Sequence, residues 1–149
     1  MEAVIFVGIQ ATGKSSFYIA RFFQTHIRIN LDMLRTRRRE TLLLRACIEM
    51  QQRFVVDNTN PTLAERANYI TPAKAAGFRV VGYYFPAVLG ECIQRNNRRS
   101  GKQIVPIKGI VGTLKRLVPP SYAEGFDALY TVRIAEPDRF SVEEWPAAP

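Results

Sequence analysis

The chain has 149 residues, of which 47% are hydrophobic, which suits one compact domain with a buried core. Its formal net charge of +8 favours an anionic partner such as nucleic acid, a nucleotide or another phosphate compound. The same charge also fits a plain solubilising surface. The two cysteines lie far apart and show neither a disulfide framework nor the spacing of a metal site, and no apolar run approaches the roughly 18 residues of a membrane span. We therefore expect a soluble, cytoplasmic protein.

The first half of the chain alternates between short apolar runs and segments with helical spacing. The apolar run at 3–7 is continuous and enters a glycine-rich loop, which is typical of a buried parallel strand and not of a signal peptide. The expected elements are strand 3–7, loop 8–13, helix 14–25, strand 26–30, helix 32–52, whole or broken near its basic run, and strand 54–57.

The second half continues the alternation. Thr62 and Glu65 have the spacing of a capping box, and Gly77 is a typical glycine beyond a helix end. The expected elements are a helix from 61–62 to 77, strand 78–85, helix 87–97, a basic loop at 98–102, helix 106–118, strand 126–134 and a tail, about 137–149, without a clear element.

The loop after the first strand matches in full the phosphate-binding pattern G-x-x-x-x-G-K-[ST]. Its glycines let the backbone wrap around phosphate oxygens, and the helix that follows turns its positive end toward the anion. Lys14 can reach the β- and γ-phosphates of a bound nucleotide, and the Ser15 hydroxyl can ligate Mg²⁺. The sequence therefore predicts a site for ATP and Mg²⁺ built from Gly8, Ile9, Gln10, Ala11, Thr12, Gly13, Lys14, Ser15 and Ser16.

Together, the loop and the alternation predict an α/β fold of the P-loop NTPase class. We expect three α/β/α layers, with a central parallel sheet of about five strands and a small lid of helix and loop. Residues 1–149 are expected to form a single P-loop kinase domain with its lid at about 95–105. Ligands of such folds bind at the carboxyl ends of the strands.

Asp32 follows the second predicted strand, where its carboxylate would face the γ-phosphate and accept the proton of an attacking hydroxyl. A plain helix-capping role for Asp32 is the alternative. Arg35 lies three residues further on and would hold a phosphate of the acceptor if the helix has begun. The single histidine, His26, starts a strand and is more typical of a structural residue than of a base.

Two further polar clusters follow predicted elements. Asp57 ends the third strand and would support Mg²⁺ through water, with Asn58 as a neighbour that orients it or makes a turn. Arg95 and Arg99 share one helical face and would close over the triphosphate, although cations are also common at solvated helix ends.

In sequence motifs, the chain resembles the kinase domain of polynucleotide 5′-kinases, including the kinase part of bacteriophage and animal kinase–phosphatases. The resemblance covers nearly the whole chain and rests on an ordered set of motifs: GIQATGKSS, INLDMLR, VVDNTNPT, ERANYITPAKAAGFRV, RNNRRSGKQIVP and EGFD. The phosphate loop alone is shared by many families. The ordered set, above all DNTNPT followed by the RNNR lid, is far more specific.

The resemblance implies a role for each matching residue. Lys14 and Ser15 would hold the triphosphate and the metal, Asp32 would be the general base that activates a 5′-hydroxyl, and Arg35 would bind the adjacent phosphate of DNA or RNA. Arg99, with Arg95, would belong to the lid. The catalytic residues would then be Asp32, Lys14 and Arg99, and the acceptor would contact Asp32, Arg35, Asp57 and Asn58.

The chain departs from the family pattern in three places. The strand-end acid falls at Asp57 as in animal members, whereas phage members have it at the place of Asn58, which leaves open the residue that supports the metal. Leu31 replaces a common arginine near the acceptor, and the length leaves no room for a phosphatase domain. A small-molecule kinase and a nucleotide-binding module without an acceptor stay open as alternatives. The sequence also leaves open whether the acceptor is DNA or RNA, whether the donor is ATP or GTP, the oligomeric state and the pathway.

Overall fold

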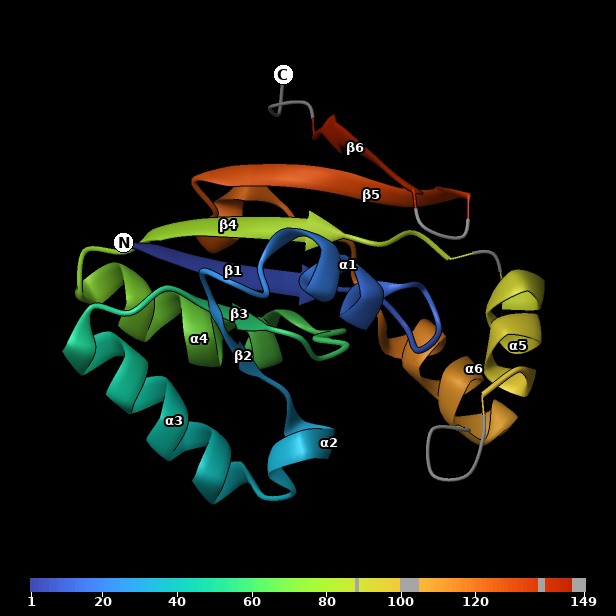
Figure 1. Ribbon diagram of the computed structural model, residues 1–149, viewed down its shortest axis with the longest axis horizontal. Helices are drawn as coiled ribbons and strands as arrows, with labels where there is room; N and C mark the ends of the chain where they lie inside the picture. Colours follow the sequence, from blue (N-terminus) through green and yellow to red (C-terminus); the bar gives the residue numbers. More distant parts are fainter. Residues whose placement is uncertain (88, 100–104, 137–138, 146–149) are drawn as a thin grey trace.

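The computed structural model describes residues 1–87, 89–99, 105–136 and 139–145, which contain one six-stranded sheet in the order β2-β3-β1-β4-β5-β6 (Figure 1). Strands β1 to β5 run parallel, and β6 is antiparallel to β5. The strands are β1 (Glu2–Val7), β2 (Ile27–Ile29), β3 (Phe54–Val56), β4 (Arg79–Tyr84), β5 (Ala128–Glu136) and β6 (Arg139–Glu144).

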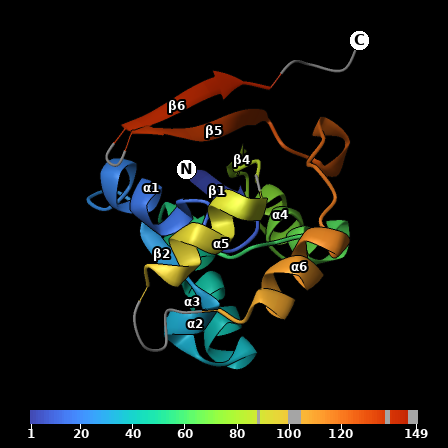
Figure 2. The ribbon, with the colours of Figure 1, turned by 90° about the vertical axis from the view of Figure 1, so that its right-hand side faces the viewer.

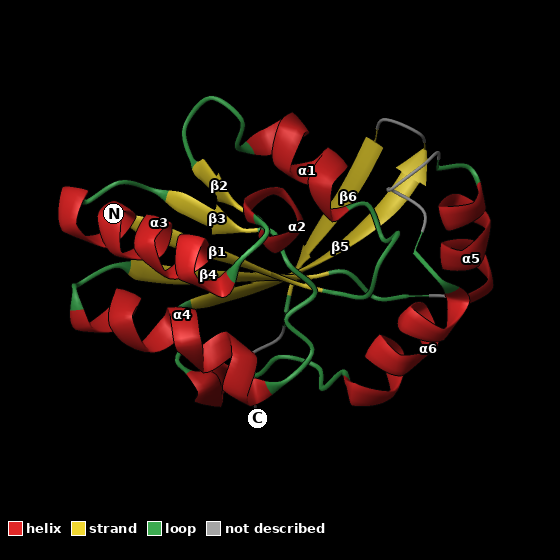
Figure 3. Ribbon diagram, turned by 90° about the horizontal axis from the view of Figure 1, so that it is seen from below, coloured by secondary structure: helices red, strands yellow, loops and turns green. Residues whose placement is uncertain are grey.

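The central strand β1 is buried on both faces because its side chains alternate between two hydrophobic clusters. Val4 and Phe6 pack against α1, whereas Ile5 and Val7 belong to the cluster under α3 and α4. Figure 3 accordingly places α1 and α4 on opposite sides of the strands. The helices that follow the first three strands are α1 (Lys14–Arg21), α2 (Leu31–Leu34), α3 (Arg37–Met50) and α4 (Leu63–Ala75).

The remaining two helices, α5 (Leu89–Asn97) and α6 (Ile107–Arg116), lie beyond the ends of β1 and β4 (Figures 1 and 2). They pack on the phosphate loop itself, since Ile9 and Ala11 form a small buried cluster with Cys92 of α5 and Ile110 of α6. A short 3₁₀ turn, η2 (Tyr122–Glu124), leads into β5. The two helices therefore border the edge of the sheet at which the parallel strands end, which we call the carboxyl edge.

The predicted α/β class and the mostly parallel sheet are confirmed, and the main error lies at the chain end. Residues 139–144, expected to lack a clear element, form the sixth strand, β6. Phe140 and Val142 alternate with exposed residues, the pattern of a strand with one covered face, and Phe140 packs against Phe17 with ring centroids 5.2 Å apart. The alternation is only two apolar residues long, which explains why the prediction missed it.

One helix end differs from the expected one, and one expected break is present. The helix predicted at 14–25 ends at Arg21, where the Phe22 backbone N–H binds the Tyr18 carbonyl. The segment 32–52, predicted to be one helix either whole or broken near its basic run, is broken there. The break falls at Arg35 and Thr36, and the Thr36 hydroxyl caps α3 by accepting from Arg39 N–H.

Helices in the described part of the chain are too short, or too polar, to cross a bilayer.

Candidate nucleotide and phosphoryl-transfer site

Gly13 of the phosphate loop is required by backbone conformation and by space, whereas Gly8 is required by space. Gly13 has φ +92°, and a Cβ there would lie 2.5 Å from Cδ1 of Ile134 in β5. A Cβ on Gly8 would lie 2.9 Å from the Cβ of Phe85. No described side chain caps the start of α1, so its first N–H groups face the loop and suit an anion.

Lys14 lies inside this loop and is buried. Its Nζ donates to the Ile9 carbonyl at 2.6 Å and lies 3.4 Å from the Thr12 hydroxyl. Burial lowers the pKa of the Lys14 ammonium to about 8, while the negative charge of Asp57 raises that pKa and the positive charge of Arg99 lowers it. Asp32 raises it more weakly. The loop thus holds a cation at an energetic cost that an anionic ligand would relieve.

This lowered pKa predicts that nucleotide binding weakens at alkaline pH. Below about pH 8, Lys14 is charged in the free protein, whereas above it the ammonium loses its proton and must regain one when it meets phosphate. We expect the affinity for ADP to fall about tenfold for each pH unit above about 8. Calorimetry in two buffers of different ionisation enthalpy measures the proton taken up, and a Lys14→Ala variant should show neither effect. Constant affinity up to about pH 9.5 would contradict this.

Ser15 and Asp57 meet at the carboxyl edge although they lie far apart in the sequence. The Ser15 hydroxyl donates to Oδ2 of Asp57 at 2.9 Å, and the Asp57 carboxylate is buried. A hydroxyl and a carboxylate are hard oxygen donors, and Mg²⁺ is commonly held by one or two such groups together with nucleotide phosphates. The pair therefore fits the ion expected from the loop. Arg28 of β2 also reaches both residues.

Asn58, the other candidate metal-supporting residue, faces a different network. Its Oδ1 accepts from Leu31 N–H at 2.9 Å, and its Nδ2 donates to Oε2 of Glu40 at 3.0 Å. Of the two neighbours, the structure places Asp57 beside Ser15 and gives Asn58 contacts to α2 and α3. The metal role of Asp57 stays a prediction, with geometry that agrees with it.

Asp32 lies exposed in the single turn of α2, and Asn30 fixes the position of that turn. The Asn30 carboxamide accepts from Met33 N–H at 2.9 Å and donates to the Asp57 carbonyl at 2.6 Å. Asn30 is therefore the N-cap of α2, and the alternative in which Asp32 is merely the cap is wrong. Arg35 lies just beyond the turn with φ +76°, so it no longer follows the helical spacing that would place it on the face of Asp32.

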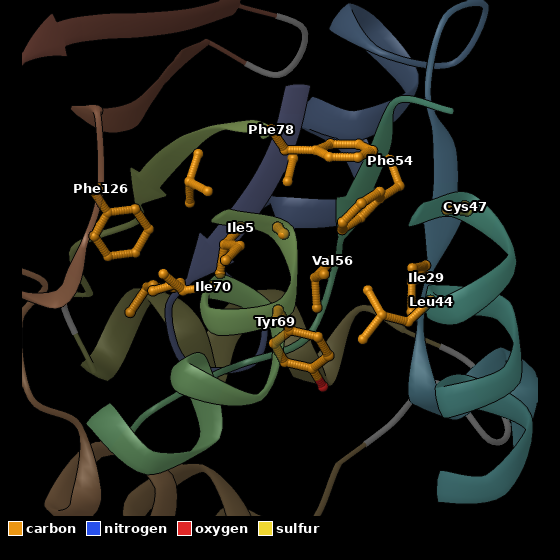
Figure 4. Close-up of a cluster of buried hydrophobic side chains, with 14 of the residues drawn as sticks. Ile5, Ile29, Leu44, Cys47, Phe54, Val56, Tyr69, Ile70, Phe78 and Phe126 are labelled. Carbon is orange, nitrogen blue, oxygen red and sulfur yellow. The ribbon is translucent and has the colours of Figure 1, made fainter. Parts of the chain in front are cut away.

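A buried Glu40 helps to hold this turn in place through Asn58, which bonds both Glu40 and the Leu31 N–H of α2. Its Oε1 accepts from the Tyr69 hydroxyl at 2.8 Å and from Nη1 of Arg37 at 2.9 Å, while Oε2 accepts from Asn58. Burial, followed by the hydrogen bond to Glu40, raises the pKa of Tyr69 to about 12. Figure 4 shows the Tyr69 ring inside the hydrophobic cluster with its oxygen at the margin. Sequence reasoning missed Glu40, whose only local signal is a carboxylate in the first turn of α3.

The arginines predicted to belong to a lid come close to the loop from α5. Nη1 of Arg95 donates to the Ala11 carbonyl at 3.2 Å, and Arg99 is near enough to Lys14 to affect its pKa. Buried Asn96, which the sequence did not single out, accepts from Val105 N–H and donates to the Val105 carbonyl, so it joins α5 to the residue that precedes Pro106, the N-cap of α6. The expected lid segment 95–105 lies partly outside the described residues, at 100–104.

The other predicted residues occupy simpler positions. Gln10 donates to the Thr113 hydroxyl of α6 at 3.0 Å, and Ser16 is exposed in the first turn of α1. His26 bonds Glu2 at 3.1 Å before β2, at the opposite edge of the sheet, which agrees with a structural residue.

No protein-family model matches the chain. Among solved structures, a gluconokinase from Sinorhizobium meliloti 1021 aligns with a TM-score of 0.61 and 19% identity, covering 91% of this chain and 84% of that chain. Kti12 from Chaetomium thermophilum in complex with ADP-AlF3 aligns with a TM-score of 0.66 and 12% identity, covering 89% of each chain. APS kinase CysC from Mycobacterium tuberculosis in complex with AMPPNP and APS aligns with a TM-score of 0.50 and 18% identity, covering 65% and 69%.

At these low identities the likeness establishes the fold, which is the α/β fold of P-loop kinases. None of these three neighbours is named as a polynucleotide kinase. The phosphoryl acceptor therefore has to be argued from the residues at the carboxyl edge.

Proposed function

We propose that the chain is an ATP-dependent kinase that transfers the γ-phosphate to the 5′-hydroxyl of DNA or RNA. The observation that carries this proposal is geometric: the Ser15 hydroxyl of the phosphate loop bonds the Asp57 side chain at 2.9 Å, and the Asp57 carbonyl accepts at 2.6 Å from Asn30, the cap of the turn that contains Asp32. A donor site and a candidate base are thus linked at one edge of the sheet. A plain nucleotide-binding module has no need of the exposed carboxylate at Asp32.

In the proposed reaction, Lys14 binds the β- and γ-phosphate oxygens and Arg95 and Arg99 neutralise the charge of the transferring group. The Asp32 carboxylate takes the proton of the acceptor hydroxyl while the hydroxyl oxygen bonds to the γ-phosphorus. The bond from the γ-phosphorus to the β–γ bridging oxygen breaks, and ADP leaves with that oxygen. Ser15 and Asp57 would hold Mg²⁺, which supplies charge neutralisation across the β- and γ-phosphates when bound.

Nucleic acid is the acceptor that the charge beside Asp32 favours. Arg35 and Arg38 are exposed on the turn and helix that follow Asp32, as is Arg39, which donates to the Leu34 carbonyl. Guanidinium groups match phosphate by two-pronged hydrogen bonds, and a polynucleotide offers a phosphate next to the reacting hydroxyl and more beyond it. The motif resemblance to polynucleotide 5′-kinases supports the same acceptor.

A small-molecule kinase is the second candidate. It is favoured by a specific observation: two structural neighbours are by their names kinases of small molecules, a gluconokinase and an APS kinase. The arginines after Asp32 would then bind an anionic group of a small acceptor. Incubation with labelled ATP and Mg²⁺ separates the two candidates, with 5′-hydroxyl oligonucleotides, single- and double-stranded, tested beside a panel of sugars, nucleosides and other small alcohols.

Label on an oligonucleotide that disappears in the Asp32→Ala variant supports the proposal. Label confined to small alcohols would replace it by the second candidate. Binding of ATP without any labelled acceptor would leave a nucleotide-binding module.

The arginine surface predicts that oligonucleotide use depends on salt. We expect the KM for a single-stranded oligonucleotide to rise with salt on a double-logarithmic plot, with a slope of about 0.7 for each phosphate contacted. An Arg38→Ala variant should lower that slope by about one contact. Arg45, also exposed on α3 but two turns further from Asp32, provides the matched control, and Arg45→Ala should keep the wild-type slope. Equal slopes in all three proteins would exclude Arg38 from the acceptor surface.

A further inference from the structure

Arg28 already binds the two side chains that are expected to hold the metal. It lies in the middle of β2, the edge strand next to β3, and no sequence motif marks it. Its Nε donates to Oδ2 of Asp57 at 2.8 Å, and its Nη2 donates to the Ser15 hydroxyl at 3.0 Å. The Ser15 hydroxyl in turn donates to the same Asp57 oxygen. The three groups form a closed triangle of hydrogen bonds.

The guanidinium explains how a carboxylate can be buried at this point. The Asp57 side chain is 1% exposed, whereas that of Arg28 is 28% exposed. An unpaired charge at that depth would be costly, and a two-point contact from arginine neutralises it. The Arg28 guanidinium carbon also lies 5.9 Å from the centre of the Tyr18 ring, which helps to hold it over the pair.

The same triangle would compete with a bound cation. The Ser15 oxygen accepts from Nη2 of Arg28, and Oδ2 of Asp57 accepts from Nε of Arg28 and from the Ser15 hydroxyl, so a cation would share both oxygens with these donors. Two cations beside one Asp57 oxygen also repel each other, and a like charge within about 4–6 Å commonly shifts a binding equilibrium by about tenfold. Arg28 therefore bonds the same two side chains that a cation would use.

We propose that Arg28 is a positioning residue that competes with Mg²⁺ for Ser15 and Asp57 and sets the Mg²⁺ concentration at which the site loads. This rests on the proposed function only in requiring a Mg²⁺-dependent nucleotide site, and it needs no particular acceptor. Replacing Arg28 should have two opposite effects. The free protein becomes less stable, because Asp57 loses its counter-charge, while loading with Mg²⁺ becomes easier.

The test measures the affinity for a fluorescent ADP analogue across a Mg²⁺ titration, with no acceptor present. The Mg²⁺ concentration that gives half of the change in affinity should be about tenfold lower for Arg28→Ala than for wild type. For Arg28→Lys, which keeps the charge without the two-point contact, that concentration should lie between those of the wild type and Arg28→Ala. Arg79→Ala is the matched control, since Arg79 is exposed on β4 and pairs loosely with Glu2 at 3.8 Å.

Thermal unfolding of the metal-free proteins provides the second readout. Arg28→Ala should unfold at a lower temperature than Arg79→Ala, and adding Asp57→Asn should restore much of the loss, because the unpaired carboxylate is its cause. An unchanged or higher Mg²⁺ requirement in both Arg28 variants overturns the inference. If the wild type binds ADP with no Mg²⁺ effect at all, the proposed donor site fails, and the inference fails with it.

Discussion

Replacing Lys14 by alanine is expected to lower the rate of phosphoryl transfer by about 100- to 1000-fold, the loss commonly seen when one charge-stabilising donor is removed from an active site. Lys14 is the only buried lysine among the described residues, and it lies within the phosphate loop. Its ammonium is buried, which lowers its pKa to about 8, and an anionic phosphate would offset the cost of that burial. Single-turnover transfer at saturating ATP measures the loss.

The Lys14→Ala variant should keep its fold. The Ile9 carbonyl that binds Lys14 also accepts from the Thr12 hydroxyl at 2.9 Å, so it keeps a partner. Removing a buried charge relieves a desolvation penalty, and we expect the thermal unfolding temperature to stay constant or rise. Lys74→Ala is the control, because Lys74 binds Gly125 and Asp127 at the amino edge of the sheet. Wild-type transfer by the Lys14 variant at saturating ATP would contradict its role.

Replacing Asp32 by asparagine is expected to lower transfer by about 100- to 10,000-fold, the range for loss of a general base. The two side chains have nearly the same shape, but a carboxamide does not take up the proton of the acceptor hydroxyl. The fold should be unaffected, because Asn30 and not Asp32 caps α2 and Asp32 is exposed. Affinity for ADP should therefore stay close to wild type while the rate of transfer falls.

The control for Asp32 is Glu49→Gln, which removes an exposed carboxylate near the end of α3. It should transfer phosphate at the wild-type rate. A wild-type rate in Asp32→Asn itself would mean that the hydroxyl loses its proton to another group. A parallel loss of ADP binding would instead assign Asp32 to the donor site.

How far the sequence reached is clearest at the phosphate loop. Gly8, Gly13, Lys14 and Ser15 were predicted from spacing within eight consecutive residues, and the structure gives them one compact loop between β1 and α1. The order of strands and helices also followed from periodicity, because burial on one or two faces determines the spacing of apolar residues in each segment. The failure at 139–144 has the same origin, since β6 has only one covered face and two apolar residues to mark it.

The acceptor side was less predictable because its contacts join distant segments. Arg28 bonds Asp57, which lies 29 positions further along the chain, and Glu40 bonds Tyr69 across the same separation. Neither Arg28 nor Glu40 belongs to a recognisable sequence motif. Register between β2 and β3 places Arg28 level with Val55, two residues before Asp57, which brings the guanidinium and the carboxylate within reach. Such a contact exists only once the strands have paired.

The sequence by itself determined a phosphate-binding loop at the head of a parallel α/β sheet, because glycine conformations and hydrophobic periodicity are local properties of the chain. Only the tertiary structure decided which carboxylate meets Ser15, which asparagine caps the turn of Asp32, and that Arg28 bonds both Ser15 and Asp57. Those outcomes depend on strand order and register, which bring side chains from β1, β2 and β3 to one edge and are fixed by packing over the whole sheet.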